Sequence, residues 1–83
     1  MCMQLSVYSL KRTLFQDEAS LLNCMTGSGE ITVLDHHRPL ISTLAEGTVK
    51  VVDSSGRESF FPVAGGFLKV GSRNDVLLMV DEQ

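Results

Sequence analysis

Short stretches in which apolar and polar residues alternate recur along this chain, and turn residues end each of them. Segments 4–8, 30–33 and 48–51 show the pattern, with an apolar residue at every second position. A period of two is typical of a β-strand that turns one face toward a core. The alternation therefore predicts an all-β fold.

Two segments have the composition of hairpin turns. The tetrapeptide DSSG at 53–56 lies between two strand-like stretches, and its glycine can supply the positive φ of a tight turn. The tripeptide RND at 73–75 separates two more, and its Asn or Asp can adopt the left-handed conformation. We expect two hairpins in the C-terminal half.

The pair Gly65 and Gly66 interrupts an apolar run and predicts a bulge, a bend or a close backbone approach. A phosphate-binding P-loop would need GxxxxGK[ST] followed by a helix, whereas strand-like residues follow here.

One segment fits the alternating pattern poorly. Between positions 10 and 22, apolar residues recur at spacings of three to four, as in an amphipathic helix. The segment lacks a good helix cap, and short apolar runs are ambiguous between helix and strand. The residues alone leave both alternatives open.

Length and charge narrow the classes of function. The 83 residues suffice for one domain, 1–83, and the net charge of −3 argues against a nucleic-acid reader, which needs a basic surface. Apolar runs are far shorter than the about 20 residues of a bilayer span. The N-terminus lacks the basic start and long apolar stretch of a secretory signal.

Cysteine and histidine content gives little support for a metal or a disulfide framework. Cys2 and Cys24 are expected to be free thiols in a cytoplasm-facing protein. His36 and His37 are adjacent, and neighbouring side chains on an extended backbone point to opposite faces, so they are poorly placed to share an ion. No serine lies in a GxSxG elbow. We expect no catalytic residues, cofactor or metal.

From Gly29 the chain reads GEITVLDHHRPLISTLAEG, then TVKV, FPVAGGFLKV and VLLMVDEQ. This ordered set, within nearly the whole chain, resembles the N-terminal β-sandwich domain of the epsilon subunit of F-type ATP synthases. That family's pattern is approximately GExGILPGHxPLLxxLxxG, then VSGGFLEV, then VxVLADEA. The resemblance implies a ten-stranded, two-sheet β-sandwich, and it favours a strand over a helix between positions 10 and 22.

The resemblance also implies a function. The expected protein is a non-catalytic subunit of the central stalk, which binds the gamma subunit and the c-ring and couples proton or sodium flux to ATP synthesis. It would lie at the cytoplasmic face of the energy-coupling membrane without inserting into it.

Site residues follow from the same resemblance. Glu30 and His37 match the motif whose loop faces the c-ring. Ser9 and Ser42 lie in segments that approach gamma. Phe60 and Phe61 must point oppositely in a strand, so one of them is expected to be an exposed anchor for gamma. The alternative for Glu30 is a solvated strand-edge charge, and for His37 a backbone hydrogen bond that caps the turn before Pro39.

The chain departs from the family at four places. Thr32, Asp35 and His36 stand where the family commonly has Gly, Pro and Gly, which bears on the shape and contacts of this loop more than on the fold. The family usually continues into a C-terminal helical hairpin that can brake ATP hydrolysis and in some members binds ATP. The sequence ends at Gln83, so we expect neither the hairpin nor its brake.

Two other classes of function stay open on the residues. One is a small β-sandwich or cupin-like enzyme with a metal bound through His36 or His37. The other is a free-standing module that binds peptide or carbohydrate.

Overall fold

A computed structural model describes residues 2–83, and these residues form strands and turns without a helix. The strands are β1 (Met3–Tyr8), β2 (Thr13–Thr26), β3 (Gly29–Leu34), β4 (Leu40–Leu44), β5 (Gly47–Asp53), β6 (Glu58–Val70) and β7 (Asp75–Glu82). The predicted all-β class is confirmed.

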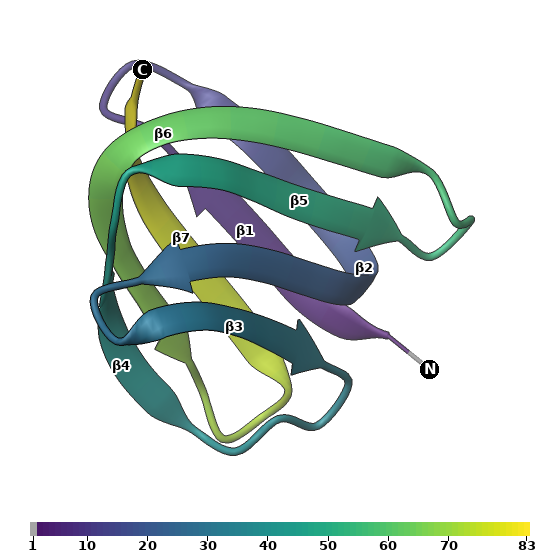
Figure 1. The fold of residues 1–83 in the computed structure, drawn as a ribbon. Coiled ribbons are helices and arrows are strands. Elements are labelled where there is room, and N and C mark those ends of the chain that lie inside the picture. Colours follow the sequence, from purple (N-terminus) through teal and green to yellow (C-terminus); the bar gives the residue numbers. More distant parts are fainter. Residues whose placement is uncertain (1) are drawn as a thin grey trace.

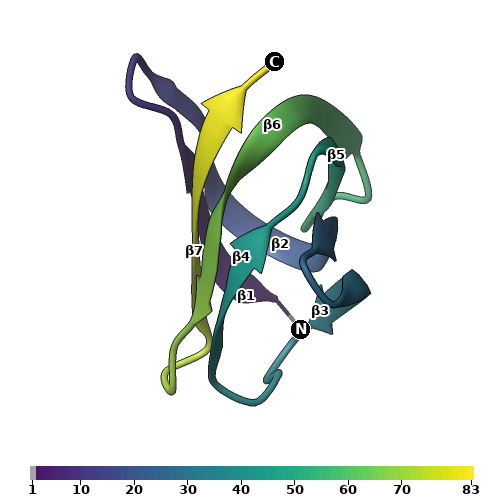
Figure 2. The same ribbon diagram turned by 60° about the vertical axis from the view of Figure 1, so that its left-hand side comes forward.

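The seven strands form one hydrogen-bonded sheet that folds over itself into two layers (Figures 1 and 2). β2 and β6 are long, and each pairs with different neighbours along its length. The first half of β2 pairs with β1 and its second half with β3 and β5. The first half of β6 pairs with β5 and its second half with β4 and β7. The first layer therefore holds β1, β7 and β4, the second layer holds β3 and β5, and β2 and β6 belong to both.

The expected count of ten strands was wrong. β2 runs for 14 residues and β6 for 13, and both continue through their bends without a break. Each of these two strands passes from one layer to the other and counts once, which accounts for two of the three missing strands.

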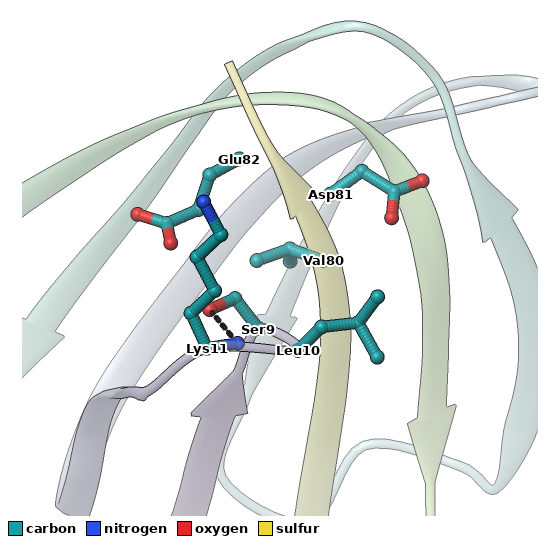
Figure 3. Close-up of a pocket in the computed structure, with 6 residues that line it drawn as sticks. All are labelled: Ser9, Leu10, Lys11, Val80, Asp81 and Glu82. Atoms are coloured by element: carbon teal, nitrogen blue, oxygen red, sulfur yellow. Dashed lines mark hydrogen bonds between the residues drawn. The ribbon is translucent and has the colours of Figure 1, made fainter.

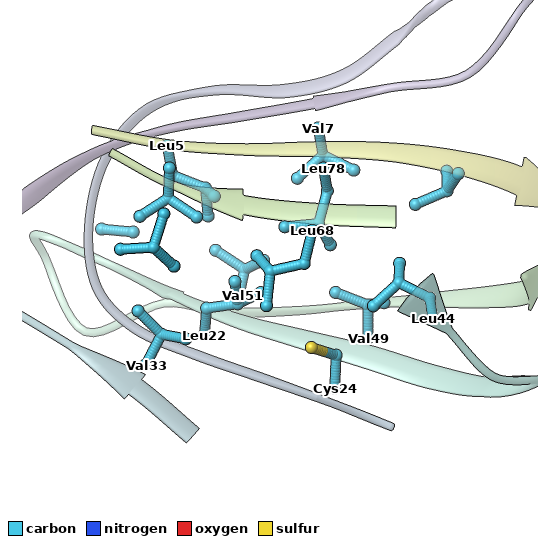
Figure 4. Close-up of a cluster of buried hydrophobic side chains, with 14 of the residues drawn as sticks. Leu5, Val7, Leu22, Cys24, Val33, Leu44, Val49, Val51, Leu68 and Leu78 are labelled. Atoms are coloured by element: carbon cyan, nitrogen blue, oxygen red, sulfur yellow. The ribbon is translucent and has the colours of Figure 1, made fainter. Parts of the chain in front are cut away.

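The core lies between the layers and consists mainly of valine and leucine from all seven strands (Figure 4). Leu5, Leu22, Leu68 and Leu78 are fully buried there. Burial also raises the pKa of the Cys24 thiol to about 11, because the apolar surroundings disfavour the thiolate. Cys2 and Cys24 are both free thiols, as expected.

Both predicted hairpins are present. Asp53 and Arg57 bracket the β5–β6 turn, in which Gly56 has φ 88°. The β6–β7 turn contains Asn74 with φ 59°. The register between β6 and β7 shifts between Val63 and Gly65, so the predicted bulge is confirmed as well.

The segment with helical spacing is a strand, and register shifts explain the misleading period. The pairing of β1 with β2 shifts between Val7 and Tyr8, and the pairing of β2 with β5 shifts between Ala19 and Leu21. A bulge changes which residues face the core. Leu10 also contributed to the apparent helical spacing, although it lies in the β1–β2 turn and is not part of the strand.

Candidate partner-binding surfaces

The turn at 34–37 presents His37 at one end of the sandwich, beside the β6–β7 turn. The backbone N–H of His37 donates to the Leu34 carbonyl at 3.1 Å and closes the turn. Nδ1 of His37 lies 2.8 Å from the Arg38 carbonyl oxygen. A proton on Nδ1 is donated there, and Nε2 is then the ring nitrogen left to accept a further hydrogen bond. The capping hydrogen bond and a partner contact are thus compatible.

A cluster of polar groups joins this turn to the β6–β7 turn. We call Asp35, His36 and Asn74 the Asn74 clamp. Asn74 accepts a hydrogen bond from the His36 N–H and donates one to the Asp35 carboxylate. The bond from Asn74 is the first cause that lowers the pKa of Asp35, and His36 adds to it. Asp35 is thereby held as a carboxylate.

His36 has a left-handed backbone, with φ 61°. Histidine lacks the freedom of glycine at positive φ, yet the loop keeps this conformation. The one hint in the sequence is that the resembled family commonly has glycine at this position, whereas the group that holds His36 comes from a turn 38 residues away.

Glu30 lies away from His37. It is an exposed residue near the start of β3, opposite Met25 of β2, whereas His37 follows the end of that strand. Glu30 and Leu34 are about 13 Å apart, because a strand rises about 3.3 Å per residue. The structure does not bring the two expected c-ring residues into one cluster.

The four residues expected to meet gamma lie in three places. The Ser9 hydroxyl accepts hydrogen bonds from the N–H groups of Lys11 and Arg12 in the β1–β2 turn. Ser42 lies on β4 opposite the buried Leu68, on the inward side of the first layer.

Phe60 and Phe61 diverge as the strand geometry requires. Phe60 is 57% exposed on the outer side of the second layer, and Phe61 packs against the core.

A larger apolar surface covers the outer side of the first layer. We call Leu10, Ile41, Phe67 and Met79 the Phe67 face. Phe67 of β6 pairs with Met79 of β7 on one side and with Thr43 of β4 on the other. Ile41 lies two residues before Thr43, so its side chain is on the same outer side of the layer. The exposed fractions are 92% for Leu10, 76% for Ile41 and 42% for Phe67. These side chains form a partly exposed apolar patch, the kind of surface that marks interaction sites.

Two adjoining hollows border Leu10. One of about 220 Å³ is lined by Ser9, Leu10, Lys11 and the end of β7 (Figure 3). The other, of about 370 Å³, lies between Leu10 and the pair Phe67 and Met79. At the rim, Arg12 Nη2 lies 2.7 Å from Glu82 Oε1, and this hydrogen bond is the first cause that lowers the pKa of Glu82. Ser9 is the expected gamma residue that lies on this border.

Sequence reasoning missed Leu10 and Met79 as surface residues. The signal for Leu10 was the KR dipeptide that follows it, since an apolar residue beside two charges after a strand fits an exposed turn. Met79 gave no such signal, because β7 is apolar on both sides and only the register shows which side faces out.

Residues 2–83 offer neither a cluster of metal ligands nor a membrane-spanning helix. No group of three or more His, Cys, Asp and Glu side chains is placed to hold a metal ion in this part of the chain. Within the same residues, no helix is long and apolar enough to cross a membrane.

Comparison with known proteins links this geometry to one family. The family described as "ATP synthase, Delta/Epsilon chain, beta-sandwich domain" matches residues 2–82. An ATP synthase epsilon chain of Dichelobacter nodosus is 36% identical over 75 residues, which are 90% of this chain and 52% of that protein. The epsilon chain of Bordetella petrii is 40% identical over 68 residues, 82% of this chain and 48% of that protein. The chain thus spans about half the length of these curated relatives.

Solved structures share the fold. A chain in the mitochondrial ATP synthase of Euglena gracilis, in a structure of OSCP, F1 and c-ring, superposes with a TM-score of 0.90 at 23% identity. The match covers 98% of this chain and 51% of that one. A chain in the central stalk and c-ring of the Tetrahymena thermophila enzyme gives a TM-score of 0.82 at 14% identity, and covers 96% of this chain and 63% of that one.

Proposed function

Since the chain belongs to the β-sandwich family of ATP synthase delta and epsilon chains, we propose that it is a non-catalytic subunit of the central stalk of an F-type ATP synthase. In this role it binds the gamma subunit and the c-ring and couples ion-driven rotation to ATP synthesis. It lies peripherally at the cytoplasmic face of the energy-coupling membrane. The observation that carries the proposal is the family match along residues 2–82, which includes both layers of the sandwich.

Gamma binds mainly through the Phe67 face. This surface offers the largest exposed apolar side chains of the first layer, and apolar anchors supply most of the energy of such contacts. Ser9 borders the face. Phe60 contributes where gamma extends along the first half of β6, whereas Ser42 and Phe61 face inward and are less well placed for a direct contact.

The c-ring contacts Glu30 and His37. The Glu30 carboxylate and the His37 imidazole can each form a hydrogen bond or ion pair with polar side chains or backbone groups of a c-ring loop. Exposed polar contacts of this kind fix the orientation of the two partners more than they add to the affinity. The two residues lie at opposite ends of β3, so each meets a different part of the ring surface.

The test is reconstitution of the full chain with purified gamma and with detergent-solubilised c-ring. We expect a stable complex with gamma and a ternary complex with the ring on size exclusion. Phe67→Ser is expected to weaken gamma binding by about tenfold or more, since a central apolar anchor is a typical hot spot. Thr48→Ser, an exposed β5 position on the other layer, is the control and should bind like wild type. A folded chain that binds neither gamma nor the ring would contradict the proposal.

A further inference from the structure

We propose that Asn74 is a positioning residue, whose carboxamide holds the turn at 34–37 in its left-handed shape and so fixes the place of His37. The role of His37 toward a partner rests on the proposed function. The positioning itself rests on contacts within the chain.

The turn needs support because its sequence disfavours its shape. His36 has φ 61°, a region that costs a non-glycine residue free energy. The contact between Asp35 Oδ2 and His36 Nδ1, at 2.9 Å, joins two side chains and does not hold the His36 backbone. Within the turn, the backbone bond from His37 to Leu34 is the closing contact.

Asn74 supplies the support with both ends of its side chain. Its Oδ1 accepts from the His36 N–H at 2.7 Å, directly at the left-handed residue. Its Nδ2 donates to Asp35 Oδ1 at 2.6 Å and to the Cys2 carbonyl at 3.2 Å. These bonds use both amide protons and an acceptor position of one side chain.

Asn74 is itself fixed in place. Its backbone is left-handed, with φ 59°, and its carbonyl accepts from the Gln4 N–H at 3.0 Å. The surrounding turn is closed by the bond from the Gly71 N–H to the Asp75 carbonyl at 2.7 Å. The β6–β7 turn, which is held by its own hydrogen bonds, thus stabilises the turn at 34–37. Asn74 also bonds to the start of β1 through the Cys2 carbonyl and the Gln4 N–H.

The consequence reaches His37 because it is the next residue along the chain. The His36 φ sets the direction in which the backbone enters His37, and the Arg38 carbonyl then fixes the ring through Nδ1. Without the Asn74 side chain, the turn is expected to open and His37 to lose its fixed direction.

Amide hydrogen exchange of the full chain by NMR tests this inference. Asn74→Gly removes the carboxamide and keeps the left-handed backbone accessible. We expect the His37 amide to exchange about tenfold faster or more, since the turn loses two or three hydrogen bonds. The Leu68 amide of the core should keep its protection. Asn23→Ala removes another asparagine hydrogen bond, the one to Thr32, and should leave His37 unchanged.

Rescue separates positioning from general destabilisation. His36→Gly makes the turn favourable by itself, so in that background Asn74→Gly should change His37 exchange by less than about twofold. Equal effects of Asn74→Gly in both backgrounds, or no effect in either, would overturn the inference. If Asn74→Gly does not fold, Asn74→Asp keeps the acceptor for His36 and replaces the donor to Asp35 by a like charge, and unchanged His37 exchange in that variant would also overturn it.

The partner arm uses the detergent-solubilised c-ring with gamma present. Asn74→Gly should weaken ring binding, and addition of His36→Gly should restore it. If the variants show the expected differences in exchange but the wild-type chain binds neither gamma nor the ring, the proposed function alone is refuted. If the wild-type chain binds the ring but Asn74→Gly does not change the exchange rate of the His37 amide, the positioning role alone is refuted.

Discussion

Gly66 shows how one residue type sets the bend of a strand. Its φ is 139°, and a Cβ built there would lie 2.1 Å from the Met79 carbonyl oxygen of the neighbouring strand. Backbone atoms cannot move aside as a flexible side chain can. The close approach of β6 and β7 at the bulge therefore depends on the absence of a side chain.

Gly66→Ala is expected to lower the free energy of unfolding by about 2 to 4 kcal/mol, because strain at positive φ adds to the clash. Gly47→Ala is the matched control. Its Cβ would meet Met25 Cβ at 3.5 Å, an ordinary contact, so the change should stay within about 1 kcal/mol. Urea unfolding of both variants measures the difference, and similar losses in the two would contradict this account of the bend.

Residue patterns predicted the local features and missed the long-range ones. Gly65 and Gly66 predicted the bulge. The side chains of Phe60 and Phe61 point to opposite sides of the strand, one exposed and one against the core, as predicted. The family's glycine at position 36 was a hint of the left-handed backbone, but the bonds from Asn74 that hold His36 could not be predicted, because they come from a distant turn. Contacts of this kind appear only once the fold has brought two turns together.

At the scale of elements, the β5–β6 hairpin depends on a polar side chain in its turn. Asp53 Oδ1 accepts from the Ser55 N–H, the Ser55 hydroxyl and the Arg57 N–H, at 2.7–2.9 Å. The Ser55 hydroxyl and then the Arg57 N–H hold the pKa of Asp53 below its ordinary value. The DSSG segment predicted this hairpin through its glycine, Gly56, which has φ 88°, and the Asp53 bonds are a second cause that the prediction did not use. In β2, by contrast, the bulges gave a strand the apolar spacing of a helix.

Asp53→Asn tests the pH dependence of this turn. A carboxyl whose pKa is lowered in the folded state adds stability above its unfolded pKa, and this stability is lost as the pH falls through the folded pKa. Asparagine keeps the acceptor oxygen and does not titrate. We expect the variant to be less stable than wild type at pH 6, and the difference to shrink toward pH 3.

Denaturant midpoints from pH 6 to pH 3 measure this effect. Asp81→Asn, an exposed carboxylate on β7, changes the net charge by the same amount and serves as the control. If the stability of both variants relative to wild type depends on pH in the same way, the loss of stability in acid is due to net charge and not to the turn.

At the scale of the whole molecule, a small core must serve two layers. A domain of 83 residues has a total stability of about 4 to 12 kcal/mol by the usual value per residue. Leu68 is fully buried on β6, a strand that belongs to both layers, so a cavity there affects both.

Leu68→Ala is expected to cost about 2 to 4 kcal/mol, a large share of the total. Ile41→Ala, on the exposed side of β4, should cost less than about 0.5 kcal/mol. Thermal unfolding followed by circular dichroism and by NMR signals from each layer should give coincident transitions. Separate transitions for the two layers would refute a single core.

The continuity of β6 through its bend also decides how the molecule carries mechanical load. A force that pulls on the second half of β6 reaches the first half through covalent bonds, with no need for side-chain contacts to transmit it. β2 provides a second covalent tie of the same kind. Two continuous backbones therefore connect the layers covalently, which limits how far one layer can rotate against the other.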